Sequence, residues 1–427
     1  MLTQAPKGTR DILPQEVYKW QHVENIIKEI CGNFGYSEIR IPVFEHTELF
    51  QRGVGDTTDI VQKEMYTFDD KGGRSITLRP EGTAGVVRSY IQNGMASLPQ
   101  PVKLFYNITA YRYENVQKGR YREFNQFGAE AFGAEGPSID VEIISIADLL
   151  FKKLGISNIR LNINSIGCPV CREKYGIVLK EYLEQKKEQL CSDCRVRLER
   201  NPLRVLDCKV KECNLATEGA PSMLDNLCEE CGDHFEGLKG MLEKVGIDYA
   251  VDSRIVRGLD YYTKTVFEFV SENVGTQGTI CGGGRYDGLV EACGGSVTPA
   301  VGFALGMERL IMEMDNQNAS FPLPKGPELF VASIGSDADL FAQELVYQLR
   351  ENGISAEKNH MGRSLKAQMK YADKCDAAFT VVIGENEILS NKAVLKNMET
   401  GEEKDVSLDS ILERFKRAKS ACKEGTA

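Results

Sequence analysis

The sequence predicts an α+β fold, in which an antiparallel sheet with flanking helices is interrupted by a helical insertion and followed by a separate α/β domain. Three observations predict it. Residues 104–132 alternate in polarity on both sides of a loop that ends in glycine, which is typical of an antiparallel hairpin. Eight of the thirteen cysteines lie within residues 168–231, a charged stretch with helical spacing. After the prolines near residue 322, strand and helix patterns alternate as βαβαβ.

The length of 427 residues is too great for one compact core, so we expect several domains. The expected limits are 1–167 with 246–320 for the core, 168–245 for the insertion and 327–427 for the last domain. The net charge of -10 argues against general affinity for nucleic acids, so any RNA contact must use local basic surface. No run of eighteen apolar residues and no signal-peptide pattern appears, which predicts a cytoplasmic protein without membrane contact.

The first elements are a helix after Pro14 and a strand over residues 38–45. Pro42 inside that strand predicts an edge or interface position, because proline has no N–H to give to a neighbouring strand. Residues 74–84 then pass from strand into helix. Glu81 lies where this helix begins and Thr83 is suited to cap it, so Glu81 is either a capping acid or a carboxylate that faces a cleft.

The hairpin at residues 104–132, with its loop at 115–119, places charged and aromatic side chains on one face of its strands. A buried charge must be paired or bound to a ligand, a guanidinium binds phosphate through two hydrogen bonds, and an aromatic ring can stack on a nucleobase. The alternative is a ribbon with a solvated, salt-bridged face. The residues on this face are Arg112, Glu114, Arg120, Arg122, Phe124, Gln126 and Glu130.

The helix at 138–155 and the strand at 159–164 are expected to be structural, and the cysteines follow in pairs. A gap of two residues lets both thiolates of a pair reach one tetrahedral ion, so four pairs would make two zinc sites. The alternative is a set of separate thiols without metal. The pairs are Cys168 with Cys171, Cys191 with Cys194, Cys208 with Cys213, and Cys228 with Cys231.

The basic half of the insertion, residues 172–211, is the better candidate for contact with an RNA backbone. It carries eleven basic against seven acidic residues, whereas residues 212–248 carry nine acidic against two basic. Its arginines include Arg195, Arg197, Arg200 and Arg204. A solvated helix face is the alternative explanation of such a run.

Residues 254–263 combine Arg257, Gly258, Tyr261 and Tyr262 before a strand at 266–269, which suits a pocket that neutralises phosphate and hydrogen-bonds a ring. Residues 279–289 are rich in glycine but lack the spacing and the lysine of a P-loop, and glycines inside a strand indicate close approach of another group. Residues 300–312 read as a strand that runs into a helix with Arg309 near its start.

The C-terminal domain follows a linker at 315–327. We expect strands at 328–334, 354–357 and 378–384, and helices that run to residue 349 and over residues 364–374. Two further short strands and a final helix from Leu408 complete it.

These peptides together resemble the class II aminoacyl-tRNA synthetases in the form found in the histidyl group. Residues 38–45 resemble motif 1, residues 111–130 motif 2 and residues 300–312 motif 3, while residues 254–263 and 279–289 are similar to two histidyl-specific peptides. Residues 362–372 resemble part of the anticodon-binding domain of this group. The resemblance spans residue 7 to about residue 412.

The resemblance implies ATP-dependent ligation of L-histidine to tRNA(His) through a histidyl adenylate, with Mg²⁺ and with a homodimer formed through the motif 1 region. Zinc is no requirement of the family's catalysis. The implied catalytic residues are Arg112 and Arg257 at the α-phosphate and Arg309 at the γ-phosphate. The implied ATP-binding residues are Arg112, Glu114, Arg120, Phe124 and Arg309. The implied histidine-binding residues are Glu81, Thr83, Arg112, Gln126, Glu130, Arg257, Tyr261, Tyr262 and Tyr286.

One departure and two alternatives remain. Asn115 and Val116 stand in the motif 2 loop where many relatives have Arg and Pro, which leaves the mode of tRNA acceptor-end recognition open. One alternative function is a catalytically silent synthetase-like regulatory subunit of histidine biosynthesis; the retained arginines and the C-terminal domain argue against it. The other is a zinc-dependent RNA-binding protein with a vestigial core.

Overall fold

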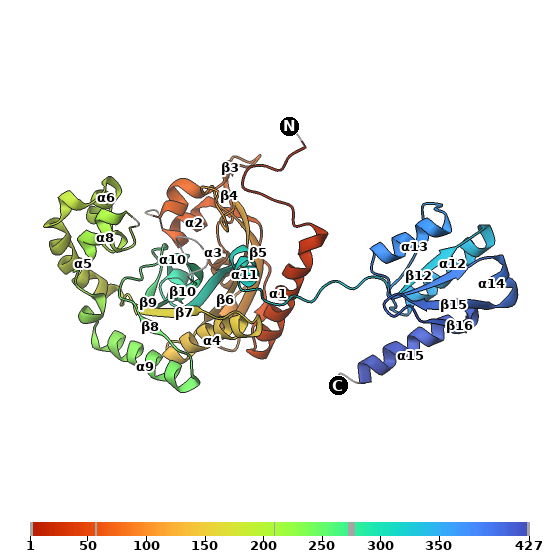
Figure 1. Ribbon diagram of the computed structural model, residues 1–427. Helices are drawn as coiled ribbons and strands as arrows, with labels where there is room; N and C mark the ends of the chain where they lie inside the picture. Colours follow the sequence, from red (N-terminus) through yellow and green to blue (C-terminus); the bar gives the residue numbers. More distant parts are fainter. Residues whose placement is uncertain (1–2, 56–57, 209, 272–277, 425–427) are drawn as a thin grey trace. The chain divides into compact units, whose positions relative to one another are not determined.

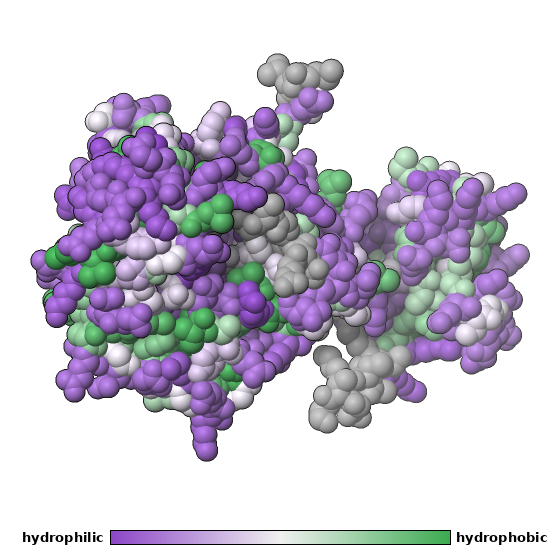
Figure 2. Space-filling view, turned by 60° about the vertical axis from the view of Figure 1, so that its left-hand side comes forward, coloured by the Kyte–Doolittle hydropathy of each residue, from purple (hydrophilic) through white to green (hydrophobic). Residues whose placement is uncertain are grey.

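The computed structural model describes residues 3–55, 58–208, 210–271 and 278–424. The chain forms two compact units, Met1–Pro322 and Leu323–Ala427 (Figure 1). No helix among these described residues is long and apolar enough to cross a membrane. The face of the molecule shown in Figure 2 is largely hydrophilic, with its hydrophobic residues in small groups.

The first unit is built on an eight-stranded sheet. Its outermost pairs, β1 with β5 and β7 with β8, are parallel, and the pairs between them are antiparallel. The strands in spatial order are β1 (Ser37–Glu38), β5 (Val102–Tyr111), β6 (Glu123–Phe132), β11 (Ala300–Gly306), β10 (Thr279–Arg285), β9 (Thr263–Ser271), β7 (Ile159–Ser165) and β8 (Ala250–Val251).

Helices cover this sheet on both faces, and a small sheet of three strands lies beside it. The helices outside the insertion are α1 (Pro14–Asn33), α2 (Thr47–Val54), α3 (Thr83–Gln92), α4 (Pro137–Lys153), α10 (Leu289–Ala292) and α11 (Met307–Asn316). The small sheet has the order β2 (Phe44–His46), β4 (Ser75–Leu78), β3 (Thr67–Asp69).

The alternation of side chains along β5 and β6 decides which residues reach the functional face. Phe105 and Phe127 belong to the core that α1, α4 and α11 form with one face of the sheet. Tyr106 belongs to the core on the opposite face, which α3 and α10 cover. Because side chains point to opposite faces at successive residues, Gln126 and Glu130 lie on the α3 face, as the hairpin pattern predicts.

The hairpin loop is longer than the sequence predicts. β5 ends at Tyr111 and β6 begins at Glu123, so the loop covers residues 112–122 rather than 115–119, and its arginines lie on the loop rather than on a strand face. The reason is that backbone N–H groups here donate to other segments. Tyr113 donates to the carbonyl of Glu64, and Arg122 donates to that of Gly8.

The predicted strand over residues 38–45 is also interrupted, since β1 ends at Glu38 and β2 begins at Phe44 in a different sheet. The carbonyls in between are satisfied by a side chain instead of a strand. Arg79 Nη1 donates to the carbonyl of Ile41 at 2.6 Å and to that of Pro42 at 3.1 Å. The strands on either side of Pro42 both lie at sheet edges, because β1 is outermost in the large sheet and β2 in the small one, but Pro42 itself lies in neither strand.

The residues between β7 and β8 are helical and enclose a small core that contains the clustered cysteines. Their helices are α5 (Pro169–Glu184), α6 (Ser192–Arg200), α7 (Leu203–Leu206), α8 (Lys211–Thr217) and α9 (Glu229–Val245). Helix α9 lies along α4 of the sheet-containing part, as Figure 1 shows, so the last helix of this segment is anchored to the rest of the unit.

The second unit has one sheet in the order β13, β12, β14, β15, β16, in which the first three strands are parallel and the rest antiparallel. The strands are β12 (Leu329–Ser333), β13 (Ala356–Lys358), β14 (Phe379–Ile383), β15 (Lys392–Asn397) and β16 (Glu403–Ser407). The helices are α12 (Ser336–Glu351), α13 (Leu365–Lys374), α14 (Glu385–Ser390) and α15 (Ile411–Glu424). The sequence pattern did not predict α14, and the final helix begins after a short 3₁₀ turn at Leu408–Ser410.

Candidate active site

A cavity of about 680 Å³ lies on the α3 face of the large sheet, and all but two of the residues that the sequence singles out for binding and catalysis line it. Only Glu130 and Tyr286 lie behind its wall. The lining members of that set are Glu81, Thr83, Arg112, Glu114, Arg120, Phe124, Gln126, Arg257, Tyr261, Tyr262 and Arg309. The cavity brings together hairpin, helix start and loop segments that are far apart in the sequence.

A single carboxylate holds two guanidinium groups at the hairpin side of this cavity. Arg120 Nε lies 2.7 Å from Glu114 Oε2, and Arg112 Nη1 lies 3.8 Å from Glu114 Oε1. Arg112 also donates to the carbonyl of Pro80 at 2.8 Å, and its guanidinium lies 5.3 Å from the centre of the Phe124 ring. Two cations for one anion leave positive charge beside an aromatic face, which suits a nucleotide phosphate next to its base.

Arg309 adds a third cation from the first turn of α11. Its Nη1 atom donates to the carbonyl of Thr279 at 2.7 Å. Burial and the nearby guanidinium of Arg120 lower the pKa of Arg309. Like charges held this close repel one another, so an anion bound between them would relieve the repulsion.

Arg257 reaches the cavity above strand β10, where it is paired with Glu268 of β9. Thr279 Oγ1 also donates to Glu268, at 2.9 Å. Although burial alone would lower it, the carboxylate of Glu268 raises the pKa of Arg257 above its ordinary value. Sequence reasoning missed Glu268, and the available signal was an acid flanked by Phe267 and Phe269 in an apolar strand.

The guanidinium of Arg257 lies directly over Gly282, which explains one glycine of the peptide 279–289. A Cβ atom at Gly282 would lie 2.4 Å from Arg257 Nη1, far inside van der Waals contact. Strand β10 therefore needs a residue without a side chain at this position, as the sequence pattern indicated.

Gly282→Ala is accordingly expected to displace Arg257 and to lower about tenfold the rate of the activity that the sequence resemblance implies, measured as histidine-dependent pyrophosphate exchange. The matched control is Gly288→Ala in the same peptide, where a Cβ would meet nothing within 4 Å, and this variant should keep the wild-type rate. Steady-state exchange assays on both variants check the prediction. Equal exchange rates for the two variants would show that the close approach of Arg257 to Gly282 does not matter for the activity.

Glu81 both accepts N–H groups at the start of α3 and lines the cavity. It is therefore a capping acid and a carboxylate that faces a cleft, the two roles that the sequence left open. Its carboxylate accepts the backbone N–H groups of Thr83 at 2.7 Å and Ala84 at 2.8 Å. Gln126 Oε1 accepts the N–H of Gly82 at 3.1 Å. Burial raises the pKa of Glu81, and the two N–H bonds oppose that shift. The fixed carboxylate suits a cationic group such as an ammonium.

Glu130 is completely buried behind the cavity and accepts three hydroxyl groups. These come from Tyr286 at 2.5 Å, Thr83 at 2.8 Å and Tyr106 at 3.2 Å. A Cβ at Gly302 would lie 1.7 Å from Glu130 Oε2, so this carboxyl also depends on a glycine. Sequence reasoning missed Tyr106 as a partner, although its phenol stands out in an otherwise apolar strand face.

Burial raises the pKa of Glu130 to about 8, which predicts a pH-dependent stability. The folded chain keeps this proton up to about pH 8, whereas the unfolded chain releases it near the ordinary carboxyl value of 4.5. The stabilising contribution is therefore complete below the lower value and is lost as the pH rises to the higher one. Glu130→Gln does not ionise, so its free energy of unfolding relative to wild type should increase by a few kcal/mol from about pH 5 to 8.

Denaturant unfolding of wild type and variant at several pH values measures this difference. The exposed Glu399→Gln in the second unit serves as the matched control for the change from a carboxyl to an amide. If the difference in free energy of unfolding between Glu130→Gln and wild type does not change with pH, the buried carboxyl does not hold its proton.

The structure also gathers the eight clustered cysteines into two groups of four. Within each group the sulfur atoms lie within 4.8 Å of one another. One group is Cys168, Cys171, Cys228 and Cys231, and the other is Cys191, Cys194, Cys208 and Cys213.

Three of the four arginines that the sequence singles out in this segment are paired with acids of the chain. Arg197 lies 3.3 Å from Asp59, Arg204 lies 3.9 Å from Asp260, and Arg195 lies 3.6 Å from Glu188. Contact of this half with an RNA backbone stays a prediction.

Comparison with known proteins agrees with this geometry. A family model described as histidyl-tRNA synthetase matches residues 8–310, and a model described as anticodon binding domain matches residues 328–418. A histidine–tRNA ligase of Acetivibrio thermocellus is 68% identical over 416 residues, which cover 97% of this chain and all of that relative. A histidine–tRNA ligase of Caldanaerobacter subterraneus subsp. tengcongensis is 58% identical, with the same coverage.

Among solved structures, the apo histidyl-tRNA synthetase of S. aureus superimposes with a TM-score of 0.84 at 42% identity. The match covers 97% of this chain and 99% of the S. aureus chain. Sequence and structure comparisons therefore agree from one end of the chain to the other. The chain belongs to the histidyl-tRNA synthetase family.

Proposed function

We propose that the protein ligates L-histidine to tRNA(His) in two steps, first forming histidyl adenylate from histidine and ATP and then passing the histidyl group to the tRNA. AMP and diphosphate are released. The observation that carries the proposal is the placement of Arg112, Arg257 and Arg309 around one cavity whose other wall offers Glu81, Thr83 and the two phenols. Family membership supports the same reaction.

In the first step a carboxylate oxygen of histidine attacks the α-phosphorus of ATP in line with the departing diphosphate. Two anions must meet, so positioning and charge neutralisation are the main catalytic contributions. Arg112 and Arg257 flank the α-phosphate, and Arg309 binds the γ-phosphate. Phe124 stacks on adenine, while Glu114 and Arg120 complete the nucleotide site.

Glu114 would help to hold Mg²⁺ bound with ATP, and this ion would neutralise charge on the phosphate oxygens. The cavity suits this ion because Glu114 supplies carboxylate oxygens, the ligand type that Mg²⁺ prefers, beside the guanidinium groups. Arg257 brings a fixed positive charge to the α-phosphate and so adds neutralisation that does not depend on a metal.

Histidine is recognised at the other wall. Glu81, Thr83 and Gln126 hold the ammonium group, and Tyr262 binds an imidazole nitrogen from the cavity wall, with Tyr261 beside it. Glu130 and Tyr286, buried next to this wall, also bind the imidazole nitrogens, which requires the ligand to replace part of their present hydrogen bonding. In neutral imidazole one nitrogen donates and the other accepts, which matches a carboxyl paired with phenols. An amino acid without these nitrogens would leave buried polar groups unpaired, which in the best cases gives discrimination of about 10⁴.

The remaining parts have proposed roles as well. We assign residues 1–167 with 246–320 to catalysis, 168–245 to the insertion domain and 327–427 to binding of the anticodon of tRNA(His).

A homodimer through the motif 1 region is supported by two exposed hydrophobic residues next to Pro42, namely Val43 and Phe44. The cytoplasm is the proposed location. The cysteine groups hold zinc in a structural role, since adenylation as described needs no thiolate.

The regulatory-subunit alternative is not favoured. Relatives at 68% and 58% identity over their full length are named ligases, and the arginines needed for adenylation meet in one cavity.

Charging of a tRNA(His) transcript with labelled histidine tests the proposal. We expect histidine to become attached to this tRNA in the presence of ATP, and not to a transcript with another anticodon and acceptor end. A folded chain that forms the adenylate but charges no tRNA(His) would remove the second step from the account.

A further inference from the structure

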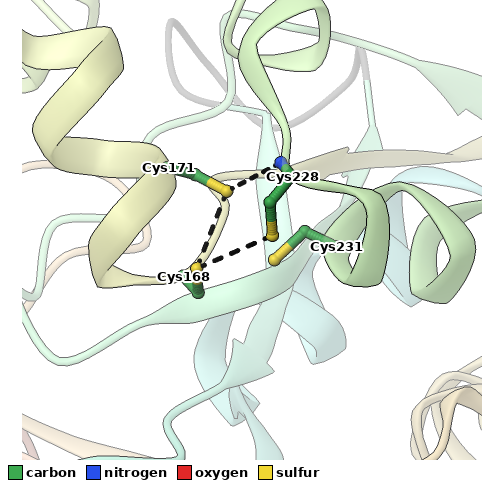
Figure 3. Close-up of side chains that lie close together, drawn as sticks. All are labelled: Cys168, Cys171, Cys228 and Cys231. Atoms are coloured by element: carbon green, nitrogen blue, oxygen red, sulfur yellow. Dashed lines mark hydrogen bonds between the residues drawn. The ribbon is translucent and has the colours of Figure 1, made fainter.

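The two cysteine groups differ in where they lie along the segment between β7 and β8. The end cluster, Cys168, Cys171, Cys228 and Cys231, joins the start of α5 to the start of α9, and Figure 3 shows its four sulfur atoms turned toward one another. The inner cluster, Cys191, Cys194, Cys208 and Cys213, lies wholly between them, around α6 and α7.

Sulfur separations in both clusters fit a shared metal ion and exclude disulfides in this arrangement. They are 3.6 Å for Cys168 with Cys171, 4.0 Å for Cys168 with Cys228, and 3.9 Å for Cys191 with Cys208. Four sulfurs about 2.3 Å from a tetrahedral zinc ion lie roughly 3.8 Å apart. A disulfide needs about 2.05 Å.

Backbone donors favour thiolates at two of the sulfurs, whereas burial disfavours thiolates unless a cation is bound beside them. The backbone N–H of Cys228 donates to Cys171 Sγ at 3.1 Å, and that of Cys191 donates to Cys213 Sγ at 3.2 Å. Cys171, Cys194, Cys213 and Cys231 are at most 1% exposed. Four thiolates this close would repel one another strongly without a cation between them, and thiolates select zinc among the common divalent ions.

We propose that each cluster binds one structural zinc ion and that the inner ion holds the wall of the reaction cavity in place. The assignment of one zinc ion to each cluster depends on the cysteine geometry alone. The link between the inner ion and the cavity rests on the proposed function of the cavity.

Residues next to two sulfurs of the inner cluster form part of the cavity wall. Leu206, Asp207 and Cys208 line the cavity, and so does Asn214 on the next helix. All of these lie within a few residues of Cys208 or Cys213, so an ion held by those sulfurs fixes the backbone that carries this wall.

The segment between Cys191 and Cys213 also contacts the loop that carries Tyr261 and Tyr262. Arg204 of α7 lies 3.9 Å from Asp260, and Asn201 donates to that carboxylate at 3.4 Å. Asp260 directly precedes Tyr261 and Tyr262. Loss of the inner ion therefore loosens both the wall and the support of the histidine pocket.

The helix that carries half of the end cluster is anchored by a buried contact of its own. His234 of α9 lies 2.7 Å from the buried carboxylate of Asp140 in α4, which also accepts Thr265 Oγ1 at 2.7 Å. Helix α9 thus stays attached to the sheet-containing part without metal. We expect loss of the end ion to destabilise the insertion but to change the reaction cavity less.

Metal analysis and pyrophosphate exchange on full-length variants test the zinc assignment and the link to the cavity. The inner-cluster variant is Cys191→Ser with Cys213→Ser, the end-cluster variant is Cys168→Ser with Cys228→Ser, and Cys375→Ser in the second unit is the control. Purified wild type and control should hold two zinc ions per chain, and each cluster variant one. The exchange rate should fall about tenfold in the inner-cluster variant and less than about fivefold in the end-cluster variant.

If a variant does not fold, the wild-type chain still decides the metal question. Titration with a mercurial thiol reagent in the presence of a zinc indicator should release two equivalents. A folded wild type without zinc, or with iron and visible absorbance in its place, would overturn the metal assignment. A folded inner-cluster variant with one zinc and the full exchange rate would overturn the link to the cavity. Zinc content is measured without substrates, so it stands apart from any failure of the ligase assignment.

Discussion

Arg257→Ala is expected to lower the rate of histidine-dependent pyrophosphate exchange by about 10³-fold, with a much smaller effect on the KM for ATP. The guanidinium of Arg257 is held by Glu268 over Gly282, so its position is fixed before substrates bind. A fixed cation at the α-phosphate acts mainly where charge develops in the transition state, so its removal should appear in kcat.

Arg254→Ala provides the matched control, because Arg254 lines the same cavity three residues away and no side-chain hydrogen bond fixes it in the described residues. Its loss removes one positive charge from the cavity without removing the fixed group. A fall in exchange of similar size in both variants would show that general charge, rather than the placement of Arg257, is responsible. Thermal unfolding of both variants excludes a loss of fold.

Glu130→Gln is expected to raise the KM for histidine about 10²-fold and to leave the KM for ATP unchanged. The carboxyl accepts three hydroxyl groups and is the buried acid nearest to Tyr286 and Thr83. A protonated carboxyl can still accept a hydrogen bond at either oxygen, whereas the NH₂ group of the amide can only donate, so the substitution removes one acceptor from the hydrogen-bond pattern that recognises imidazole.

Tyr106→Phe is the companion variant for this prediction. It removes only the longest of the three bonds, at 3.2 Å, and should raise the KM for histidine less than tenfold. Wild-type KM values for histidine in Glu130→Gln would contradict the assignment of this carboxyl to the amino acid site.

The side of the sheet on which a residue lies was predictable, because it follows from a period of two along each strand. Gln126 and Glu130 share a face with Phe124 for that reason alone, and the structure places them as expected. Where the strands end was less predictable. The hairpin loop starts at residue 112 because Gly8 and Glu64, distant in sequence, accept the N–H groups of Arg122 and Tyr113.

The partners of the site residues depend on register between strands, which the sequence does not show directly. Glu268 lies opposite Gly282 in the pairing of β9 with β10, and this places the acid beneath Arg257. Likewise, the cysteine spacing predicted four pairs but not that the first joins the last, because that choice depends on how α5 and α9 pack.

Exchange of labelled pyrophosphate into ATP, with each standard amino acid tested separately, measures directly whether the chain activates histidine. It reports formation of the adenylate without requiring tRNA. We expect exchange with histidine and with no other amino acid. Absence of exchange in a folded chain that binds ATP, or exchange supported equally by an amino acid without an imidazole ring, would contradict this expectation.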